Sequence, residues 1–279
     1  MLTIAFSSDN HLDVNRVAVD DVAQAQAKYL RDHQVDYYIN TGDTFNDFHK
    51  TLHFFEKLQS LVGLQTQVYF IAGNHDMRHG VTYDELNQSL SPLYINHRLI
   101  TIPHTNYAII GNNGWYDYSF ADQFLMKKSV SFKRWKKALW FDGMIKQPLS
   151  DAQRLAVDLN DLRNKLTYVR QHQMQAIIAT HFVPHQNFMI YGYDRPQWDM
   201  INAYLGSRKT EALLNEYHDV VKVVAFGHLH LRDYQQMIAD ILYIHRPVGY
   251  QRGRLNEWQS HDFMTEWRNT LTKIYLPQN

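Results

Sequence analysis

Histidine, aspartate and asparagine residues stand at the ends of several apolar runs in this sequence. The runs lead into these segments: Asp9-Asn10-His11, Gly42-Asp43, Gly73-Asn74-His75-Asp76, His181 and Gly227-His228-Leu229-His230. An apolar, β-branched run that stops at glycine or polar residues is typical of a buried strand followed by a loop. Open α/β sheets carry their sites at the carboxyl ends of strands. The pattern therefore predicts that these side chains, although far apart in sequence, meet in one cleft.

The residue types in these segments are those of a metal site made of nitrogen and oxygen ligands. The sequence contains no cysteine, which excludes disulfides, thiolate zinc sites and cysteine nucleophiles. Residues two apart in an extended segment share a face, so Asp9 and His11 are expected to bind one ion. By the same spacing, His228 and His230 face one ion or two adjacent ions. Such ligands favour zinc, iron or manganese over calcium.

Three further ligands make the set large enough for two ions. Asp43 follows a glycine and is suited to bridge two ions with its two carboxylate oxygens. Asn74 supplies a neutral oxygen and His181 an imidazole nitrogen. Two ions about 3.5–4 Å apart are the arrangement used for in-line displacement at phosphorus, where they lower the pKa of a bridging water. The sequence thus offers enough ligands for two divalent or trivalent ions of manganese, iron or zinc.

Strands and helices must bring these segments together. Apolar periodicity predicts strands at 2–8, 36–41, 67–72, 175–180 and 220–226, helices at 17–33, 48–62, 151–172, 199–217 and 256–271, and hairpins at 99–110 and 233–245. The β-α-β-α-β order of the first half indicates parallel pairing through right-handed crossovers. We expect one α/β domain over residues 1–279, since the candidate ligands leave no self-contained half.

Composition narrows the classes of partner. The 28 basic and 28 acidic residues balance, so the overall charge requires neither nucleic acid nor an anionic membrane. No stretch approaches 18 consecutive apolar residues, and Asp9 and His11 interrupt the first apolar run too early for a signal peptide. We therefore expect a cytoplasmic protein without a membrane partner. Oligomeric state has no signature in the sequence.

Residues 120–148 differ in character from the rest of the chain. Six cations occur with no acid between Asp122 and Asp142, and aromatic and apolar residues recur among them at near-helical spacing: Lys127, Lys128, Lys133, Arg134, Lys136 and Lys137, with Phe132, Trp135 and Leu139. We expect an inserted helical cap at about 115–150. The alternative is a solvated helix whose aromatic stripe packs on the body of the protein.

Taken in order, five motifs resemble those of the calcineurin-like metallophosphoesterases. They are Asp9-x-His11, Gly42-Asp43 with Asn46-Asp47 after it, Gly73-Asn74-His75-Asp76, His181, and Gly227-His228-x-His230, spread over roughly residues 2–245. The resemblance implies a central β-sandwich flanked by helices, two metal ions, and hydrolysis of a phosphomonoester or phosphodiester by a dimetal-activated water. It implies one ion on Asp9, His11, Asp43 and His230, and another on Asp43, Asn74, His181 and His228.

The resemblance also implies roles in catalysis. It makes His75 the residue that meets the leaving group or the phosphate, with Asp76 placed to orient it. An imidazole can donate a proton to a leaving oxygen, and a neighbouring carboxylate raises its basicity. Asp47 is a candidate partner for a ligating histidine. The candidate substrate contacts are Arg16, Trp115, Tyr116 and Tyr191, with core packing as the alternative for the aromatic residues.

The expected substrate is a small-molecule phosphoester. A nuclease of the same superfamily that follows a phosphate backbone with the basic 127–137 segment is a second hypothesis, but the patch is short and the net charge is zero. A third hypothesis is a catalytically inactive scaffold with the same fold. Such a protein is expected to lack ligands or the leaving-group histidine, whereas here every expected position is occupied.

Overall fold

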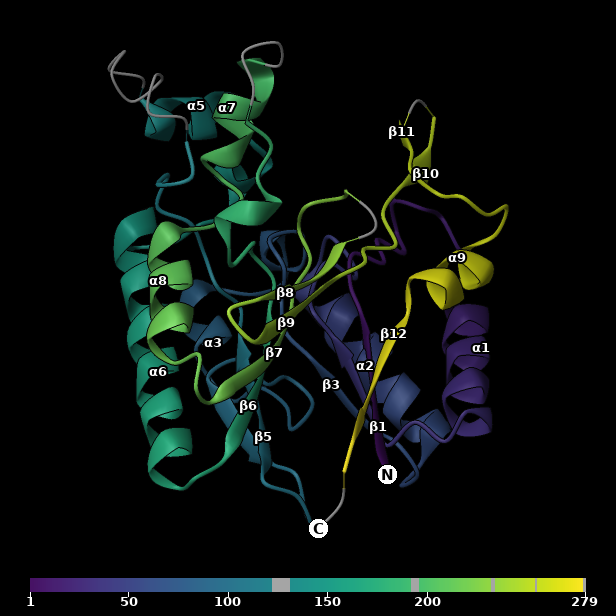
Figure 1. The fold of residues 1–279 in the computed structure, drawn as a ribbon. Coiled ribbons are helices and arrows are strands. Elements are labelled where there is room, and N and C mark those ends of the chain that lie inside the picture. Colours follow the sequence, from purple (N-terminus) through teal and green to yellow (C-terminus); the bar gives the residue numbers. More distant parts are fainter. Residues whose placement is uncertain (122–130, 192–195, 232–233, 254, 278–279) are drawn as a thin grey trace.

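Two β-sheets packed face to face form the centre of the protein, as the computed structural model in Figure 1 shows. The structure describes residues 1–121, 131–191, 196–231, 234–253 and 255–277. The amino terminus lies at the end of the molecule opposite the carboxyl end of the first strand (Figure 1). Among the residues described, no helix is long and apolar enough to cross a membrane.

The first sheet has four strands, β1 (Leu2–Ser7), β2 (Tyr37–Asn40), β3 (Gln67–Phe70) and β12 (Thr272–Leu276). Their order is β12-β1-β2-β3. The β1-β2 and β2-β3 pairs are parallel, which confirms the prediction from the β-α-β-α-β order. The last strand, β12, runs antiparallel to β1 and closes its free side.

The second sheet has six strands in the order β4-β5-β6-β7-β9-β8. They are β4 (Arg98–Thr101), β5 (Tyr107–Asn112), β6 (Gln175–Thr180), β7 (Val221–Ala225), β8 (Tyr234–Ile238) and β9 (Ile241–His245). The four inner strands are parallel, and β4 and β8 are antiparallel edges. Both predicted hairpins, β4-β5 and β8-β9, are therefore confirmed. A separate pair joins β10 (Gln251–Arg252) to β11 (Leu255–Asn256).

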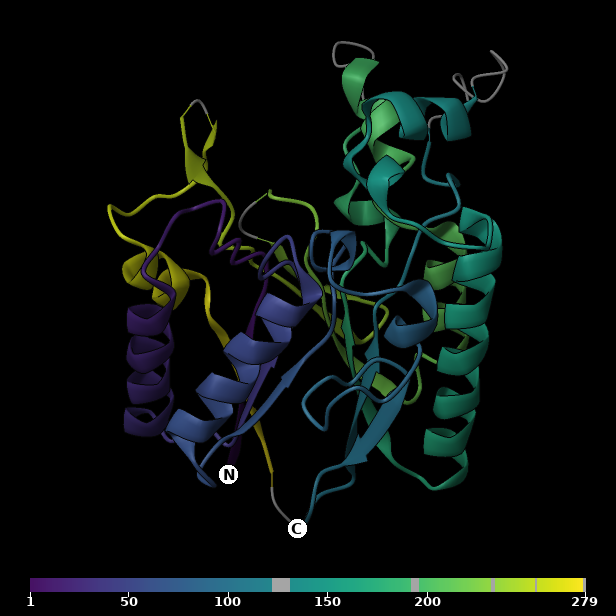
Figure 2. The same cartoon turned by 180° about the vertical axis from the view of Figure 1, so that it is seen from behind.

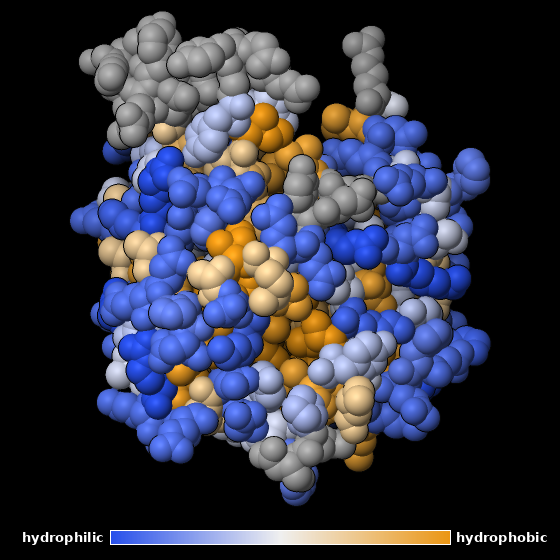
Figure 3. Space-filling model, viewed as in Figure 1, coloured by the Kyte–Doolittle hydropathy of each residue, from blue (hydrophilic) through white to orange (hydrophobic). Residues whose placement is uncertain are grey.

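Alternate residues of both sheets fill the layer between them. Ile4 and Phe6 of β1 share this core with Ile177 and Ala179 of β6 and with Ile244 of β9, and all are buried. The intervening residues point to the outer faces, where helices cover them. Because strands of this kind are buried on both faces, they read as nearly continuous apolar runs in the sequence. The apolar side chains visible near the centre of Figure 3 lie between the two polar halves of the surface.

Helices cover the outer face of each sheet. On the first sheet lie α1 (Val19–Asp32) and α2 (Phe48–Val62), and on the second lie α6 (Asp151–Gln171) and α8 (Arg208–Glu216), as Figure 2 shows from behind. The Asp47 side chain accepts a hydrogen bond from the Lys50 amide and so caps α2, whose bounds agree with the prediction. A β-sandwich flanked by helices is thus confirmed.

Two helix predictions were wrong in extent. The predicted helix 199–217 is divided into α7 (Pro196–Asn202) and α8, because Gly206 packs against the Val183 carbonyl and Ser207 caps a new helix. The predicted helix 256–271 is shorter, α9 (Phe263–Thr270), and is followed by β12, which was not predicted.

The 115–150 region contains α5 (Phe132–Leu139) and the 3-10 turn η2 (Phe141–Met144), beside α7 in both views (Figures 1 and 2). A 3-10 turn η1 (Asp76–Arg78) and a short helix α3 (Tyr83–Leu86) follow β3, and η3 (Gln186–Phe188) follows β6. Lys127 and Lys128 of the basic stretch lie outside the described residues. The assignment of 115–150 as a cap insertion stays a prediction.

Candidate active site

The loop after β1 is held against the loop after β2 by backbone hydrogen bonds. The amide of Asp9 donates to the Gly42 carbonyl at 2.9 Å, and that of His11 donates to the Asp43 carbonyl at 3.0 Å. Asp9, His11, Asp43 and His228 all have left-handed backbones, with φ of 54°, 43°, 59° and 72°. The prediction of an extended Asp-x-His segment was therefore wrong, since tight turns aim these side chains. Such conformations cost of order 1–3 kcal/mol each and cluster at functional sites.

Two glycines allow the loops to approach each other closely. Gly42 has φ of 101°, and a Cβ there would lie 2.6 Å from the Gly73 nitrogen. A Cβ on Gly73 would lie 2.1 Å from Asp43 Oδ1 and 2.6 Å from His181 Cε1. Both glycines are thus required by the space between the candidate ligands.

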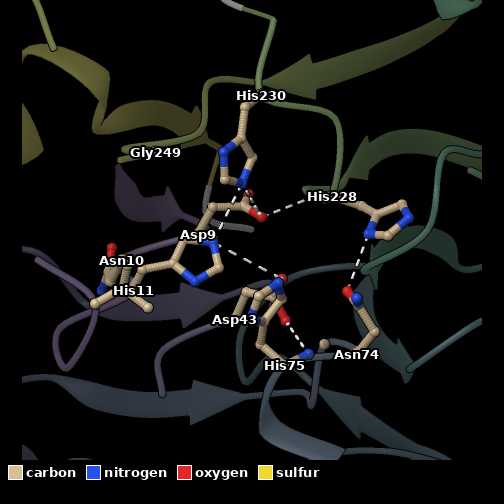
Figure 4. Close-up of polar contacts among 12 residues, drawn as sticks. Asp9, Asn10, His11, Asp43, Asn74, His75, His228, His230 and Gly249 are labelled. Carbon is tan, nitrogen blue, oxygen red and sulfur yellow. Dashed lines mark hydrogen bonds and ion pairs between the residues drawn. The ribbon is translucent and has the colours of Figure 1, made fainter. Parts of the chain in front are cut away.

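The first of two ligand clusters joins the loop after β1 to the loop after β7 (Figure 4). The Nε2 atoms of His11 and His230 are 3.2 Å apart, and His230 Nε2 is 3.3 Å from Asp9 Oδ1. Asp9 and His11 are fully buried, and the side chain of His230 is 13% exposed. These residues form a group that could hold one metal ion.

The second cluster brings together Asn74, His181 and His228. Asn74 Oδ1 is 3.0 Å from His181 Nε2 and 3.0 Å from His228 Nδ1. Figure 4 shows the His228 ring turned toward the Asn74 amide and away from His230. The two histidines of the Gly-His-Leu-His segment therefore face different clusters, which is one of the two arrangements left open by their spacing.

Asp43 lies between the two clusters. Its Oδ2 atom is 3.9 Å from His11 Nε2 in the first cluster and 3.4 Å from His181 Nε2 in the second. Its Oδ1 atom accepts a hydrogen bond from the His75 amide at 2.8 Å. The side chain is 2% exposed. This is the geometry required of a carboxylate shared by two cations.

The chemistry of the donor set fits metal ions. Lone pairs of imidazole nitrogens and carboxylate oxygens converge within a buried volume, where unshared negative charge is costly. Asp9 Oδ2 is buried without a hydrogen-bond partner in the described part of the chain. Cations placed between these groups would satisfy them.

Charge in the cluster agrees with cation binding. Burial lowers the pKa of His181, but Asp43 and Asp9 outweigh this and raise it to about 9. Burial also lowers the pKa of His230, but its hydrogen bonds to Asp9 and Glu257 raise it to about 10. The acidic neighbours thus favour positive charge at these two imidazoles, as they would favour a bound cation.

Three acceptors orient the histidines that are candidate ligands. Glu257 Oε2 accepts from Nδ1 of His230 at 2.8 Å, and the Thr41 carbonyl accepts from Nδ1 of His181 at 2.9 Å. The Tyr204 carbonyl lies 3.2 Å from Nε2 of His228. A proton held on the outer nitrogen leaves the inner nitrogen free to bind a metal. Asp47, predicted for such a role, instead caps α2.

His75 is oriented by Asn46 and not by Asp76. Its Nδ1 is 2.7 Å from Asn46 Oδ1, and the Asn46 amide group donates to Asp13 Oδ2 at 3.0 Å. Asp76 is fully buried and accepts hydrogen bonds from four backbone amides and one hydroxyl, those of Asp43, Thr44, Phe45, Gly73 and Thr51. The prediction for Asp76 was therefore wrong, because its oxygens hold the ligand loops together.

Aromatic rings surround the His75 imidazole. The Phe141 ring stacks on it at 3.9 Å between centroids, and the Tyr250 hydroxyl lies 3.2 Å from its Nε2. Burial lowers the pKa of His75, with Asp43 acting in the opposite direction. The sequence did not predict that Phe141 and Tyr250 lie at the site, because aromatic residues in loops show no periodic pattern.

The predicted aromatic substrate contacts are not confirmed by their positions. Trp115 and Tyr116 are 1% and 0% exposed and stack on each other at 4.8 Å, so they are core residues. Tyr191 is 41% exposed, and its hydroxyl donates to the Phe120 carbonyl. Arg16 lines a cavity of about 330 Å³ next to the loop that carries His11, together with Leu12, Asp13, Phe45 and Lys50.

One cation of the basic segment is not available to a phosphate backbone. Lys136 is 8% exposed, and its Nζ is 2.5 Å from Asp151 Oδ1. Lys133 and Arg134 are exposed on α5. Phe132 of the same helix packs on Tyr118 at 5.2 Å, as expected for an aromatic stripe that contacts the body.

Comparison with solved structures identifies the fold. One neighbour is the phosphopantetheinyl hydrolase from Mycobacterium tuberculosis, with a TM-score of 0.64, 17% identity, and coverage of 99% of this chain and 98% of that one. A dimetal phosphatase from Danio rerio has a TM-score of 0.53 and 13% identity over 88% and 87% of the two chains. The protein TT1561 of Thermus thermophilus has a TM-score of 0.54 and 11% identity over 88% and 89%. Identities this low establish a shared fold only.

Comparison of the sequence itself identifies the family. No curated protein matches the sequence. The family model described as calcineurin-like phosphoesterase matches residues 2–232, which include all seven candidate ligands. The resemblance noted from the motifs is thus confirmed, and this chain belongs to the calcineurin-like phosphoesterase family.

Proposed function

We propose that this protein is a phosphoesterase that hydrolyses a small-molecule phosphate ester at a dinuclear metal centre. The observation that carries the proposal is the position of Asp43 Oδ2, 3.9 Å from a ligand of one cluster and 3.4 Å from a ligand of the other. Family membership supports the general reaction class. Two-metal sites are used for in-line displacement at phosphorus.

The proposed ligands divide between two ions that share Asp43. Asp9, His11, Asp43 and His230 would hold one ion, and Asp43, Asn74, His181 and His228 the other. Manganese, iron and zinc all suit this set of imidazole, carboxylate and amide ligands. When bound, such a pair supplies an activated water and positive charge for the phosphate oxygens.

His75 is the proposed proton donor to the leaving oxygen. Its Nδ1 is occupied by Asn46, which turns Nε2 toward Asp43 Oδ2, 4.0 Å away. A positioned imidazole within hydrogen-bond reach of a reacting oxygen contributes typically 10²–10⁴-fold to the rate. In the balanced step, the oxygen of a water molecule forms a bond to phosphorus as the bond to the leaving group breaks. The water's proton is released to solvent, and the leaving oxygen takes a proton from Nε2 of His75, which acts in its protonated form.

The pocket beside the loop that carries His11 supports a proposal for the substrate contacts. Arg16 beside the 330 Å³ cavity is the proposed contact for the non-reacting part of the substrate, with Leu12 and Phe45 as apolar surface. Because one structural neighbour is named a phosphopantetheinyl hydrolase, a substrate carrying a phosphopantetheinyl group belongs among the diesters tested. The pairing of Lys136 with Asp151 disfavours the nuclease alternative.

The test is turnover of p-nitrophenyl phosphate and its bis ester by protein loaded with manganese. We expect hydrolysis of at least one of them, no activity and reduced metal content for Asp43→Ala, and reduced turnover with near-normal metal content for His75→Ala. Protein shown by metal analysis to be loaded, yet inactive on both esters and on the phosphopantetheinyl substrate, would contradict the proposal. Equal metal loss in both variants would contradict the separate roles.

A further inference from the structure

Two consecutive residues of the 3-10 turn η2 contact two consecutive residues of the Gly-Asn-His-Asp motif. Phe141 stacks on His75 with ring centroids 3.9 Å apart and an interplanar angle of 20°. Asp142 accepts a hydrogen bond from Asn74 Nδ2 at 2.7 Å. These contacts join segments that are distant in the sequence, and they connect the segment after α5 directly to the candidate metal centre.

Asp142 is a buried carboxylate with a specific donor on each oxygen, and the Tyr116 side chain also lies against it. Its Oδ1 accepts from Asn74, and its Oδ2 accepts from Trp140 Nε1 at 3.2 Å. The residue is 0% exposed. A buried carboxylate is costly unless it is paired with donors, so its presence here calls for a role that an apolar residue could not fill.

The carboxylate determines which atom Asn74 turns toward the ligand cluster. A side-chain amide has one oxygen and one NH₂ group of nearly the same shape, and only the oxygen binds a cation. An ionised carboxylate is an acceptor only, so it holds the Asn74 NH₂ group on its own side. Asn74 Oδ1 is then directed to His181 and His228, 3.0 Å from each.

We propose that Asp142 is a positioning residue that fixes the Asn74 amide with its oxygen toward the second ion. Phe141, on the same turn, holds the plane of the His75 ring. The turn after α5 thereby positions both the candidate ligand Asn74 and the proposed proton donor His75. This inference rests on the proposed function, because it assumes that Asn74 is a ligand.

The inference predicts unequal effects on the two ions. Truncation in Asp142→Ala removes the acceptor and lets the amide rotate, so the second ion should bind about 10–100-fold more weakly. The first ion has no ligand in contact with Asp142 among those assigned here and should bind as before. Asp142→Asn keeps one acceptor oxygen for two donors and should give an intermediate affinity.

The test is a titration of metal-free protein with Co²⁺, followed by visible absorption and by metal analysis after gel filtration. Wild type, Asp142→Ala, Asp142→Asn and Asn74→Ala are compared. Met144→Ala is the matched control, since Met144 lies on the same turn and is 49% exposed. We expect the affinity for the second ion to fall modestly in Asp142→Asn and further in Asp142→Ala. In Asn74→Ala it should be no higher than in Asp142→Ala, and in Met144→Ala it should be unchanged.

Each outcome has a separate meaning. Two ions bound with wild-type affinities in Asp142→Ala would overturn the inference and leave the proposed function intact. Wild type that does not bind two ions would contradict the proposed function itself. Two other results would also overturn the inference, because each indicates that Asp142 supports the fold in general. One is equal loss of both ions in Asp142→Ala that is folded. The other is wild-type metal binding in Asp142→Asn together with an Asp142→Ala variant that circular dichroism shows to be unfolded.

Discussion

Glu257 gives the sharpest prediction, because one of its oxygens serves two donors at the candidate metal centre. Glu257 Oε2 accepts from Nδ1 of His230 at 2.8 Å and from the Tyr250 amide at 2.7 Å. The residue lies 27 positions after His230 and beyond the matched residues 2–232. In the metal-bound protein, its carboxylate would keep the proton of His230 on Nδ1 and leave Nε2 for the first ion.

Two substitutions separate orientation from charge. Glu257→Ala removes both hydrogen bonds, and loss of such a partner typically weakens metal binding 10–100-fold. This factor corresponds to about 1.4–2.7 kcal/mol. Glu257→Gln keeps an acceptor oxygen of the same reach, so we expect it to retain most of the affinity. The expected order of affinity is wild type, Glu257→Gln, Glu257→Ala.

The assay is competition for Mn²⁺ or Zn²⁺ between the protein and a chelator of known affinity, at fixed pH. Circular dichroism serves as the control for folding. Unchanged affinity in Glu257→Ala would refute the assignment of Glu257 as the partner of His230. Equal weakening in Glu257→Gln and Glu257→Ala would instead show that the negative charge, and not the hydrogen bond, provides the effect.

Three further predictions follow from the same geometry. Asn46→Ala should lower kcat by about 10-fold or more while leaving metal content unchanged, because it frees Nδ1 of His75. Loss of metal in this variant would count against a role limited to orienting His75. The pKa values of His181 and His230 are raised to about 9 and 10 in the metal-free protein, so metal binding at pH 7.5 should release protons and should strengthen as pH rises. Calorimetry in buffers of different ionisation enthalpy measures the proton release, and heats that do not depend on the buffer would contradict this prediction. Trp267→Ala should lower the free energy of unfolding by about 3–5 kcal/mol, because the ring is fully buried against Tyr38. Urea denaturation measures the change, and a loss under 1 kcal/mol would be inconsistent with that packing.

The sequence predicted the elements whose apolar pattern is regular. Strands β1, β2, β3 and β6 and helix α2 follow uninterrupted apolar runs or helical spacing, and the structure places them close to the predicted bounds. The candidate ligands were found because each stands where such a run ends. Periodicity alone indicated parallel α/β units, and the sandwich of two sheets was implied only by the motif resemblance.

Other features depend on contacts between distant segments. The antiparallel strand β12 forms because β1 has a free edge, which the residues of the tail do not reveal. The chain between α7 and α8 leaves the helical path because Leu205 and Gly206 pair with Val183, which belongs to another loop. Neither constraint is local to its own segment.

The supports of the site were missed for the same reason. Glu257 and Asp142 lie in segments without metal-ligand motifs, and their importance is visible only from the atoms they contact. Asp76 was misassigned because adjacency to His75 in sequence suggested contact, whereas its side chain turns toward the backbone amides of the loop after β2. In a tight turn, neighbouring side chains point to different places.

A crystal structure of protein loaded with Mn²⁺, with anomalous scattering measured to locate the ions, tests the central claim most directly. We expect two anomalous peaks about 3.5–4 Å apart, with Asp43 Oδ2 bound to both. His11 and His230 should contact one peak, and Asn74, His181 and His228 the other. A single peak, or ions that Asp43 does not bridge, would contradict it.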